Sequence, residues 1–250
     1  MRPPGLSQSV HTVTGAVTAW NPGADGQVLS LTVNGATVIA AGFFQTLGGQ
    51  PRQGVGILDA ATGLATAWNA GVNPFGYVMT CLVNGSTLYV GGSFHSIGGA
   101  FRANRAAVDL ATGLATAWDP GADFYVWSLL RNGGTLYVGG DFANCGGQPR
   151  SRVAAVDLAT GLALAWNPGA DARVLALGLT GGTLYLAGSF QALAGQPRHF
   201  AGAVNATTGA LAAWNPDFDR RGMALVASAG SIFVGGDFNI RGGLARTNAA

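Results

Sequence analysis

The residues of this chain that could carry out acid–base chemistry are few and uniform. Of its 250 residues, thirteen are basic and all of these are Arg, while the eleven acidic residues are all Asp. Glycoside hydrolysis needs two carboxyl groups flanking the scissile bond, about 5–10 Å apart. Asp141 and Asp237 are the best candidates, because they replace Ser93 and Ser189 in other copies of one motif. A glycoside hydrolase is therefore one hypothesis, and the even spread of Asp and the absence of Glu count against it.

Metal, nucleotide and disulfide chemistry have little support in the sequence. His11, His95 and His199 are scattered, and an Asn-Pro-Gly-Ala-Asp loop offers one carboxylate, too few for a calcium site. The Gly-rich phosphate-binding spacings are also missing. Cys81 and Cys145 stand where other copies have Leu or Ile, so we expect both to be buried and unpaired. We expect no metal, no cofactor and no catalytic residue in the favoured interpretation.

Aromatic residues break the regularity of the chain in one region and form the predicted ligand site. They are interleaved with few charges, which suits stacking on sugar rings or contact with a protein. An open alternative is that they fill the space left by a two-residue insertion before Tyr77. The predicted ligand-binding residues are Phe75, Tyr77, His95, Phe101, Phe124, Tyr125 and Trp127.

These residues are set in a repeat that occurs five times. Trp recurs at spacings of 48, 50, 48 and 48 residues, and Phe recurs with the same period. A period of 40–50 residues indicates a solenoid or propeller. The Trp positions are 20, 68, 118, 166 and 214, and the Phe positions are 44, 94, 142, 190 and 238.

Each repeat contains four short predicted strands. In the second copy these are 78–83, 87–91, 104–109 and 114–118, separated by Asn-Gly and Thr-Gly turns that tolerate positive φ. Four antiparallel strands per 48 residues are typical of one propeller blade. We therefore predict an all-β, five-bladed β-propeller.

The ends of the chain fit a closed ring. In repeat register Ala250 is followed by Ser9, so residues 9–250 make five repeats and residues 1–8 overhang. The last blade would be shared between residues 9–20 and 221–250, with an N-terminal outer strand pairing with the C-terminal strands. Such closure would hide the sheet edges.

The repeat resembles the delta-60 repeat, a β-propeller repeat of bacterial surface and secreted proteins. The resemblance rests on Asn-Pro-Gly-Ala-Asp at 21–25 and 167–171, Gly-Gly-Asp-Phe at 139–142 and 235–238, and Gly-Gly-Gln-Pro-Arg at 146–150. Ala-Ala-Gly-Phe-Phe at 40–44 departs from the pattern. The resemblance implies an extracellular or cell-surface location and implies no catalytic residues.

The charged residues that recur in each repeat are explained by structural roles before functional ones. An Asp before each Thr-Gly turn, as at Asp59, should bond the turn backbone. The Arg that follows each Gly-Gly loop, at 52, 102, 150, 198 and 246, should contact the Asp that follows each Trp, at 25, 123, 171 and 219. These contacts would join neighbouring blades.

The favoured function is a non-catalytic binding or interaction module. A formal charge of +2 gives no reason to expect nucleic acid, and no apolar run is long enough for membrane insertion or a secretory signal. We expect a monomer whose partner is a carbohydrate or a protein. A repeat scaffold without a selected ligand, isolated or engineered, is the remaining alternative.

The closure hypothesis predicts that residues 1–20 stabilise the whole chain. Their deletion removes the proposed outer strand and Trp20, and loss of one buried aromatic typically costs about 3–5 kcal/mol. Thermal unfolding should therefore occur at a clearly lower temperature in the truncated chain. An unchanged melting temperature would exclude this closure.

Overall fold

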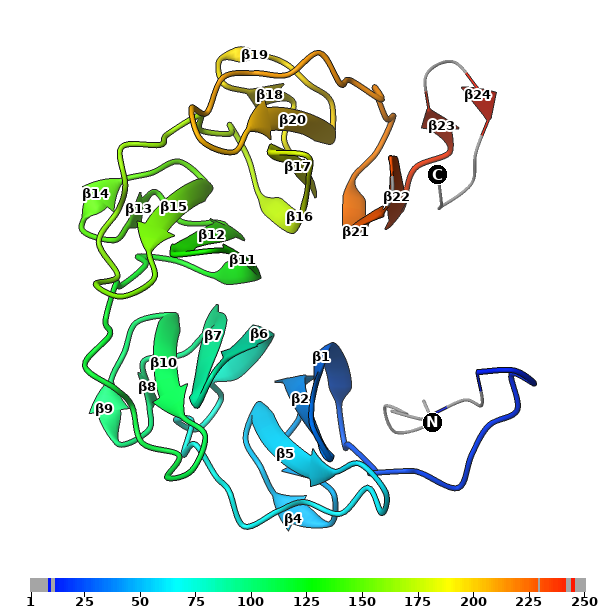
Figure 1. Ribbon diagram of the computed structural model, residues 1–250, viewed down its shortest axis with the longest axis vertical. Helices are drawn as coiled ribbons and strands as arrows, with labels where there is room; N and C mark the ends of the chain where they lie inside the picture. Colours follow the sequence, from blue (N-terminus) through cyan, green and yellow to red (C-terminus); the bar gives the residue numbers. More distant parts are fainter. Residues whose placement is uncertain (1–8, 10–11, 229, 242–243, 246–250) are drawn as a thin grey trace. The chain divides into compact units, whose positions relative to one another are not determined.

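The structure, a computed structural model, describes residues 9, 12–228, 230–241 and 244–245. The chain divides into two compact units, Met1–Asp119 and Pro120–Ala250, and each is described by itself. The described residues form strands, turns and loops, and none of them is helical, which confirms the all-β prediction (Figure 1). No described segment is therefore a helix able to cross a membrane.

Unit 1 contains two copies of one antiparallel arrangement. In each copy two long strands and a shorter third strand form a sheet, and a two-residue hairpin lies in the loop between the second and third strands. The first sheet is β1 (Gln27–Asn34), β2 (Thr37–Phe43) and β5 (Val55–Asp59), and its hairpin is β3 (Thr46–Leu47) and β4 (Gln50–Pro51). The second sheet is β6 (Tyr77–Asn84), β7 (Thr87–Ser93) and β10 (Arg105–Asp109), and its hairpin is β8 (Ser96–Ile97) and β9 (Ala100–Phe101).

Unit 2 contains two further complete copies and part of a third. The complete sheets are β11 (Val126–Asn132), β12 (Thr135–Gly140) and β15 (Val153–Asp157), and β16 (Val174–Thr180), β17 (Thr183–Gly188) and β20 (Ala201–Asn205). Their hairpins are β13 (Asn144–Cys145) with β14 (Gln148–Pro149), and β18 (Ala192–Leu193) with β19 (Gln196–Pro197). The last copy has β21 (Gly222–Ser228), β22 (Ser231–Gly236), β23 (Ile240–Arg241) and β24 (Leu244–Ala245).

The predicted fourth strand is a single β-bridge in each complete copy. Ala115, in the predicted strand 114–118, pairs only with Val108, and the other three bridges are Leu58 with Ala65, Val156 with Ala163, and Val204 with Leu211. The chain then turns away through Trp and, in most copies, a Pro that cannot donate a ladder hydrogen bond. The small hairpins were predicted as loops. The structure thus has antiparallel sheets of three strands where four strands were predicted. The number of blades and the pairing of residues 9–20 with the C-terminal strands stay predictions.

The recurring Phe and Trp form the apolar interior of each unit. Phe44, Phe94, Phe142, Phe190 and Phe238 are at most 1% exposed. Trp68 and Trp166 are also buried, and each indole Nε1 donates to a main-chain carbonyl in the next copy, at Asp109 and Asn205. The Trp column therefore links consecutive copies within a unit as well as filling space.

The recurring Arg does not bind the recurring Asp, so that sequence prediction is wrong for the described copies. Arg52 donates through Nη1 to Pro51 O at 2.7 Å and through Nη2 to Thr66 O at 2.5 Å. Arg102, Arg150 and Arg198 repeat this pattern, and Arg246 lies outside the described residues. A planar guanidinium fork suits two carbonyls at once. The Arg thereby fastens the segment beyond the lone bridge, where a strand ladder is missing.

The recurring Asp after each Trp instead organises the loop that follows the second strand. Asp25 Oδ1 accepts from the amides of Gln45 and Thr46, at 2.8 and 3.0 Å, and Asp123 and Asp171 accept from the equivalent amides. Burial raises the pKa of Asp25, but these amide bonds outweigh it, so the pKa of Asp25 is lowered. The two loops at this end of each sheet are therefore held together.

The Asp before each Thr-Gly turn behaves as predicted. Asp59 Oδ1 accepts from Thr62 N at 2.7 Å, Thr62 Oγ1 at 2.8 Å and Ala61 N at 3.0 Å, and Gly63 follows with φ 75°. Asp109 and Asp157 make the same contacts, and Asn205 replaces the carboxylate in the next copy. The Thr amide and hydroxyl hydrogen bonds lower the pKa of Asp59, Asp109 and Asp157.

These turns predict a specific acid sensitivity. Because the folded pKa lies below the ordinary value, the stabilisation is present above that value and is lost as pH falls through the folded pKa. We expect the urea midpoint to fall as the pH is lowered from about pH 5 to about pH 2. The triple variant Asp59→Asn, Asp109→Asn, Asp157→Asn should show a shallower fall, because Asn205 already fills this position without charge. Equal slopes for the two proteins would contradict the assignment.

The Arg fork makes a second prediction. Arg52→Lys keeps the charge but cannot reach both carbonyls in one plane, so unfolding should cost about 1–3 kcal/mol less than in the parent. Arg131→Lys is the matched control, because Arg131 is exposed and bonds only its neighbouring Gly133 O. Denaturant unfolding of both variants measures the difference. Equal stability of the two variants would show that the fork contributes little.

Candidate functional site

In unit 2, a glycine at the end of the second strand of a copy lets the backbone after that strand contact the backbone just before the first strand. A Cβ on Gly140 would lie 2.2 Å from Tyr125 O, so only glycine allows the approach. The next amide, Asp141 N, donates to the same carbonyl at 2.8 Å. Asp141 is therefore fixed by its backbone beside the start of β11.

A β-bulge redirects the neighbouring indole. The register between β11 and β12 shifts between Val126 and Ser128, which leaves Trp127 as the extra residue. The same shift occurs in β1, β6, β16 and β21. Bulges commonly re-aim a side chain at a functional position. Here the bulge places the Trp127 indole against the Asp141 carboxylate.

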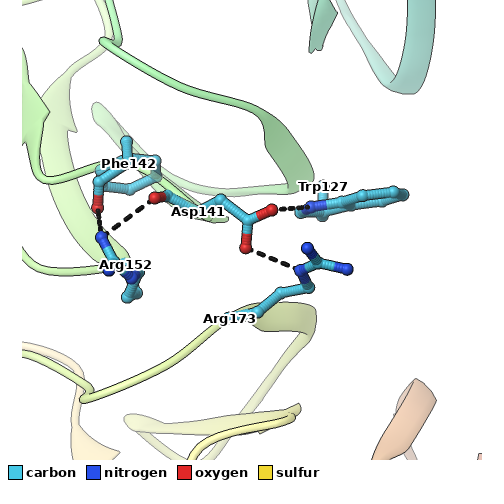
Figure 2. Close-up of polar contacts among 5 residues, drawn as sticks. All are labelled: Trp127, Asp141, Phe142, Arg152 and Arg173. Atoms are coloured by element: carbon cyan, nitrogen blue, oxygen red, sulfur yellow. Dashed lines mark hydrogen bonds and ion pairs between the residues drawn. The ribbon is translucent and has the colours of Figure 1, made fainter.

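Trp127, Asp141 and Arg173 form a polar cluster that joins two neighbouring copies (Figure 2). Asp141 Oδ2 accepts from Trp127 Nε1 at 3.2 Å, and Asp141 Oδ1 accepts from Arg173 Nε at 2.7 Å. The Arg173 guanidinium carbon lies 5.2 Å from the centroid of the Trp127 ring. The Asp141 side chain is 11% exposed, whereas that of Arg173 is 40% exposed. Asp141 thus orients a guanidinium whose outer end faces solvent.

The two outer nitrogens of Arg173 are the available donors of the cluster. Among the described residues, Arg173 Nη1 and Nη2 have no hydrogen-bond partner, because Asp141 engages only Nε. A guanidinium that is already oriented loses less conformational entropy when it binds a ligand. The arrangement is suited to binding hydroxyl, carbonyl or anionic oxygens.

Arg152 belongs to the same cluster and has a strained backbone conformation. It adopts φ 66°, and its Nη1 donates to Asp141 O at 3.0 Å and Phe142 O at 2.9 Å (Figure 2). The backbone requires this conformation, because Arg152 N donates to Phe142 O and Arg152 O accepts from Gly140 N. Gly54 holds the equivalent place in the first copy, also with positive φ. A bulky residue there costs about 1–3 kcal/mol, which marks the position as functional or specially constrained.

Asp141, Arg152 and Arg173 line a hollow of about 600 Å³, here called the Asp141 hollow. Its lining also includes Phe124, which is 48% exposed, and Ser189. The complete lining is Phe124, Asp141, Arg152, Asp171, Ala172, Arg173 and Ser189.

A second hollow of about 540 Å³ lies one copy further along the chain and is here called the Asp237 hollow. Arg221 Nε binds Asp237 Oδ2 at 2.5 Å, with the two side chains 47% and 45% exposed. Its lining is Ser189, Phe200, Arg220, Arg221, Asp237 and Asn239. Phe200 occupies the position of Arg152 and has φ 64°.

Three of the predicted site residues belong to unit 2 and lie at the Asp141 hollow or beside it. Phe124 lines the hollow, and its ring lies 4.3 Å from that of Tyr125, at an interplanar angle of 33°. Trp127 bonds Asp141, which also lines the hollow. The prediction therefore brought together three residues that the structure places near one another.

The four other predicted site residues belong to unit 1. Phe75 and Phe101 are 77% and 69% exposed, and Phe75 has φ 64° in a turn closed by Gly76 N and Asn73 O. His95 is exposed, and its amide donates to Asn73 Oδ1 at 2.8 Å. Tyr77 is partly buried and packs edge-on against Phe43 at 5.0 Å. Tyr77 thus packs as a space-filling residue, the alternative interpretation of the aromatic residues, whereas Phe75 and Phe101 are exposed to solvent.

The proposed carboxylate pair does not share one hollow. Asp141 binds Arg173 and Asp237 binds Arg221, each in its own hollow. The other carboxylate of the Asp141 hollow, Asp171, accepts the amides of Gln191 and Ala192 and so has a structural role. Neither hollow holds two unengaged carboxylates for acid–base hydrolysis.

Three residues of the hollow were not predicted from the sequence as site residues: Arg152, Arg173 and Ser189. Arg173 and Arg221 occupy the position that Gln27, Tyr77 and Tyr125 hold in other copies, so a change of residue type within a repeat column was a detectable signal. The positive φ of Arg152 was hidden, because only the first copy has glycine at that place.

The remaining reactive groups are separate from this site. Within the described part of the chain, no three His, Cys or Asp residues gather as metal ligands. No disulfide joins Cys81 and Cys145, and both are buried, as predicted. Burial raises the pKa of the Cys81 thiol, which makes the reactive thiolate scarce.

Comparison with known proteins gives a likeness of fold. No protein-family model matches the chain, and no curated protein matches it. The chain is similar to the crystal structure of the computationally designed Ika8 protein, with a TM-score of 0.61 and 14% identity over 96% of this chain and 67% of that chain. A second similar structure is the computationally designed Ika4 protein, with a TM-score of 0.46 and 14% identity over 66% of this chain and 87% of that chain. At this identity the likeness to Ika8 concerns the fold alone, and it agrees with an all-β repeat architecture.

Proposed function

We propose that the chain is a non-catalytic binding module that takes a carbohydrate in the Asp141 hollow. The observation that carries the proposal is the oriented Arg173, fixed by Asp141 and Trp127 with its two outer nitrogens available. The exposed ring of Phe124 lines the same hollow. A sugar presents a weakly polar ring face and a rim of hydroxyl groups, so it needs an apolar surface beside oriented polar groups.

The oxygen chemistry of the hollow fits hydroxyl recognition. The outer nitrogens of Arg173 donate only, whereas Asp141 carries lone pairs beyond its two bonds and is 11% exposed. Ser189 adds a hydroxyl that can donate or accept. A sugar hydroxyl both donates and accepts, and the lining therefore offers a partner for each role.

A binding module is favoured over a glycoside hydrolase by the state of the carboxylates. A hydrolase of this type needs a proton donor and a second carboxylate. Asp141 is paired with Arg173, and Asp171 accepts two backbone amides, so both carboxylates are engaged by groups of the protein itself. A protein partner is the other candidate for the same surface, because exposed aromatics and Arg are common in protein interfaces.

We also propose the finer assignments that follow from the sequence. Five copies of the Trp and Phe columns support a five-bladed propeller closed by residues 9–20. The resemblance to the delta-60 repeat supports an extracellular or cell-surface location in a bacterium. The similarity to computationally designed proteins is one of fold, and a scaffold without a ligand remains the alternative tested below.

A glycan array screened with the full chain tests the proposal. Phe124→Ala and Arg173→Gln should each weaken binding of the best glycan about tenfold or more, because one aromatic stack contributes about 1–3 kcal/mol. Phe233→Ala is the matched control, since Phe233 is an aromatic of similar exposure on β22. Thermal unfolding of each variant shows whether a loss of binding reflects a loss of fold.

The outcomes separate the candidate functions. Absence of any bound glycan would contradict the proposal and favour a protein partner or a scaffold without a ligand. Release of shorter products from a bound glycan, abolished by Asp141→Asn, would favour the hydrolase. Weaker binding by Phe75→Ala would show that the exposed aromatic residues of unit 1 take part in glycan binding, as the sequence predicted.

A further inference from the structure

The two hollows of unit 2 are the same structural position, displaced by one repeat of 48 residues. Arg173 corresponds to Arg221 and Arg152 to Phe200, while Ala172 corresponds to Arg220. Each hollow is lined by residues of two consecutive copies. Ser189 belongs to the later copy at the Asp141 hollow and to the earlier copy at the Asp237 hollow, so it lines both. The hollows are therefore adjacent and share one wall.

The linings differ in charge although the backbone plan is shared. The Asp141 hollow has two Arg and two Asp, so its formal charges balance. The Asp237 hollow has Arg220 and Arg221 against Asp237 alone, which leaves one positive charge in excess. At the equivalent places, Arg220 replaces the small Ala172, and Asp219, which corresponds to Asp171, is not among the lining residues.

The two guanidinium groups of the Asp237 hollow have N–H donors that no described residue accepts. Arg221 uses Nε to bind Asp237, and no other described residue accepts from its Nη1 or Nη2. Arg220 is exposed and makes no hydrogen bond or ion pair with a described residue. Two adjacent guanidinium groups can bind a carboxylate or sulfate through paired, charge-assisted hydrogen bonds.

Phe200 adds an apolar wall at an unfavourable backbone conformation. Its φ of 64° is imposed by two main-chain bonds, from Phe200 N to Phe190 O at 2.8 Å and from Gly188 N to Phe200 O at 2.9 Å. Part of the ring packs against the core around Phe218, and the residue also lines the hollow. An apolar wall next to two guanidinium groups suits a sugar ring that carries an acidic substituent.

We propose that the two hollows are consecutive subsites for one acidic oligosaccharide. A neutral sugar unit would occupy the Asp141 hollow, and a unit carrying a carboxylate or sulfate would occupy the Asp237 hollow, with the chain passing Ser189. This inference rests on the proposed function and narrows its ligand class. The shared wall supports one extended ligand rather than two independent ones, because binding at adjacent linked sites raises the effective concentration of the second unit.

The test is an array of paired acidic and neutral glycans, probed with the full chain. We expect the strongest hits to be acidic. Titration of the best hit, next to the same glycan with its carboxylates reduced to alcohols or its sulfates removed, should show about tenfold tighter binding of the acidic form, and this preference should shrink as salt rises. The carboxylated and sulfated members of the array separate the two sources of the acidic group.

Variants locate the effect in the Asp237 hollow. Arg220→Gln and Arg221→Gln should remove most of the preference for the acidic form, because each variant removes one guanidinium group from the Asp237 hollow. Arg131→Gln makes the same change of charge in unit 2 on an Arg that lines neither hollow and is the matched control. Ser189→Trp should weaken the long glycan more than a monosaccharide, because it raises the wall that the chain must pass. Thermal unfolding of each variant verifies the fold.

Two failures are distinguishable. If glycans bind through Phe124 and Arg173 but show no acidic preference, or a preference that Arg220→Gln and Arg221→Gln leave intact, the subsite is refuted and the proposed function stands. If no glycan binds, both proposals fail. A loss of the acidic preference in Arg131→Gln as well would show that net charge, rather than this hollow, is responsible.

Discussion

The close approach of two backbone segments at the end of each second strand is the constraint on which the repeat depends. At Gly42, Gly92, Gly140, Gly188 and Gly236 a Cβ would lie 2.0–2.3 Å from the carbonyl oxygen of the residue that precedes or begins the first strand. That approach is possible only for glycine, and the adjoining bulge lets the first strand accommodate it. The side chains that follow the glycine, such as Asp141, therefore face the entry of the first strand in unit 2. The polar cluster around Asp141 is a direct result of this geometry.

The sequence predicted the features that depend on local chemistry and on the period. The all-β class, the Asn-Gly and Thr-Gly turns, the turn role of Asp59 and the burial of the Phe column all follow from residue types at fixed spacing. It failed for the Arg column, because an Arg can satisfy carbonyls as well as carboxylates and only the fold decides which group it reaches. The fourth strand was overestimated, since a Trp-Asn-Pro-Gly segment with β-forming neighbours still has to leave the sheet after one bridge.

The site was partly predictable for a related reason. Departure from the repeat identified Phe124, Tyr125 and Trp127, which the structure places around Asp141. It could not show that Trp127 is the bulged residue or that Arg173 crosses to Asp141 from the next copy, because both depend on the direction in which side chains leave a distorted strand. The aromatic residues of unit 1 also depart from the repeat, and one of them, Tyr77, packs against Phe43.

The position held by Gly54, Asn104, Arg152 and Phe200 has a consequence for how such repeats diverge. Its conformation is maintained by main-chain bonds at all four of these residues, whichever side chain is attached. Duplication of a repeat therefore supplies a residue that can change in character, from none to an amide, a cation or a ring, without a change in backbone plan. In Arg152 and Phe200 that residue lines a hollow. A tandem array of this kind can acquire new recognition chemistry one copy at a time while its older copies retain theirs.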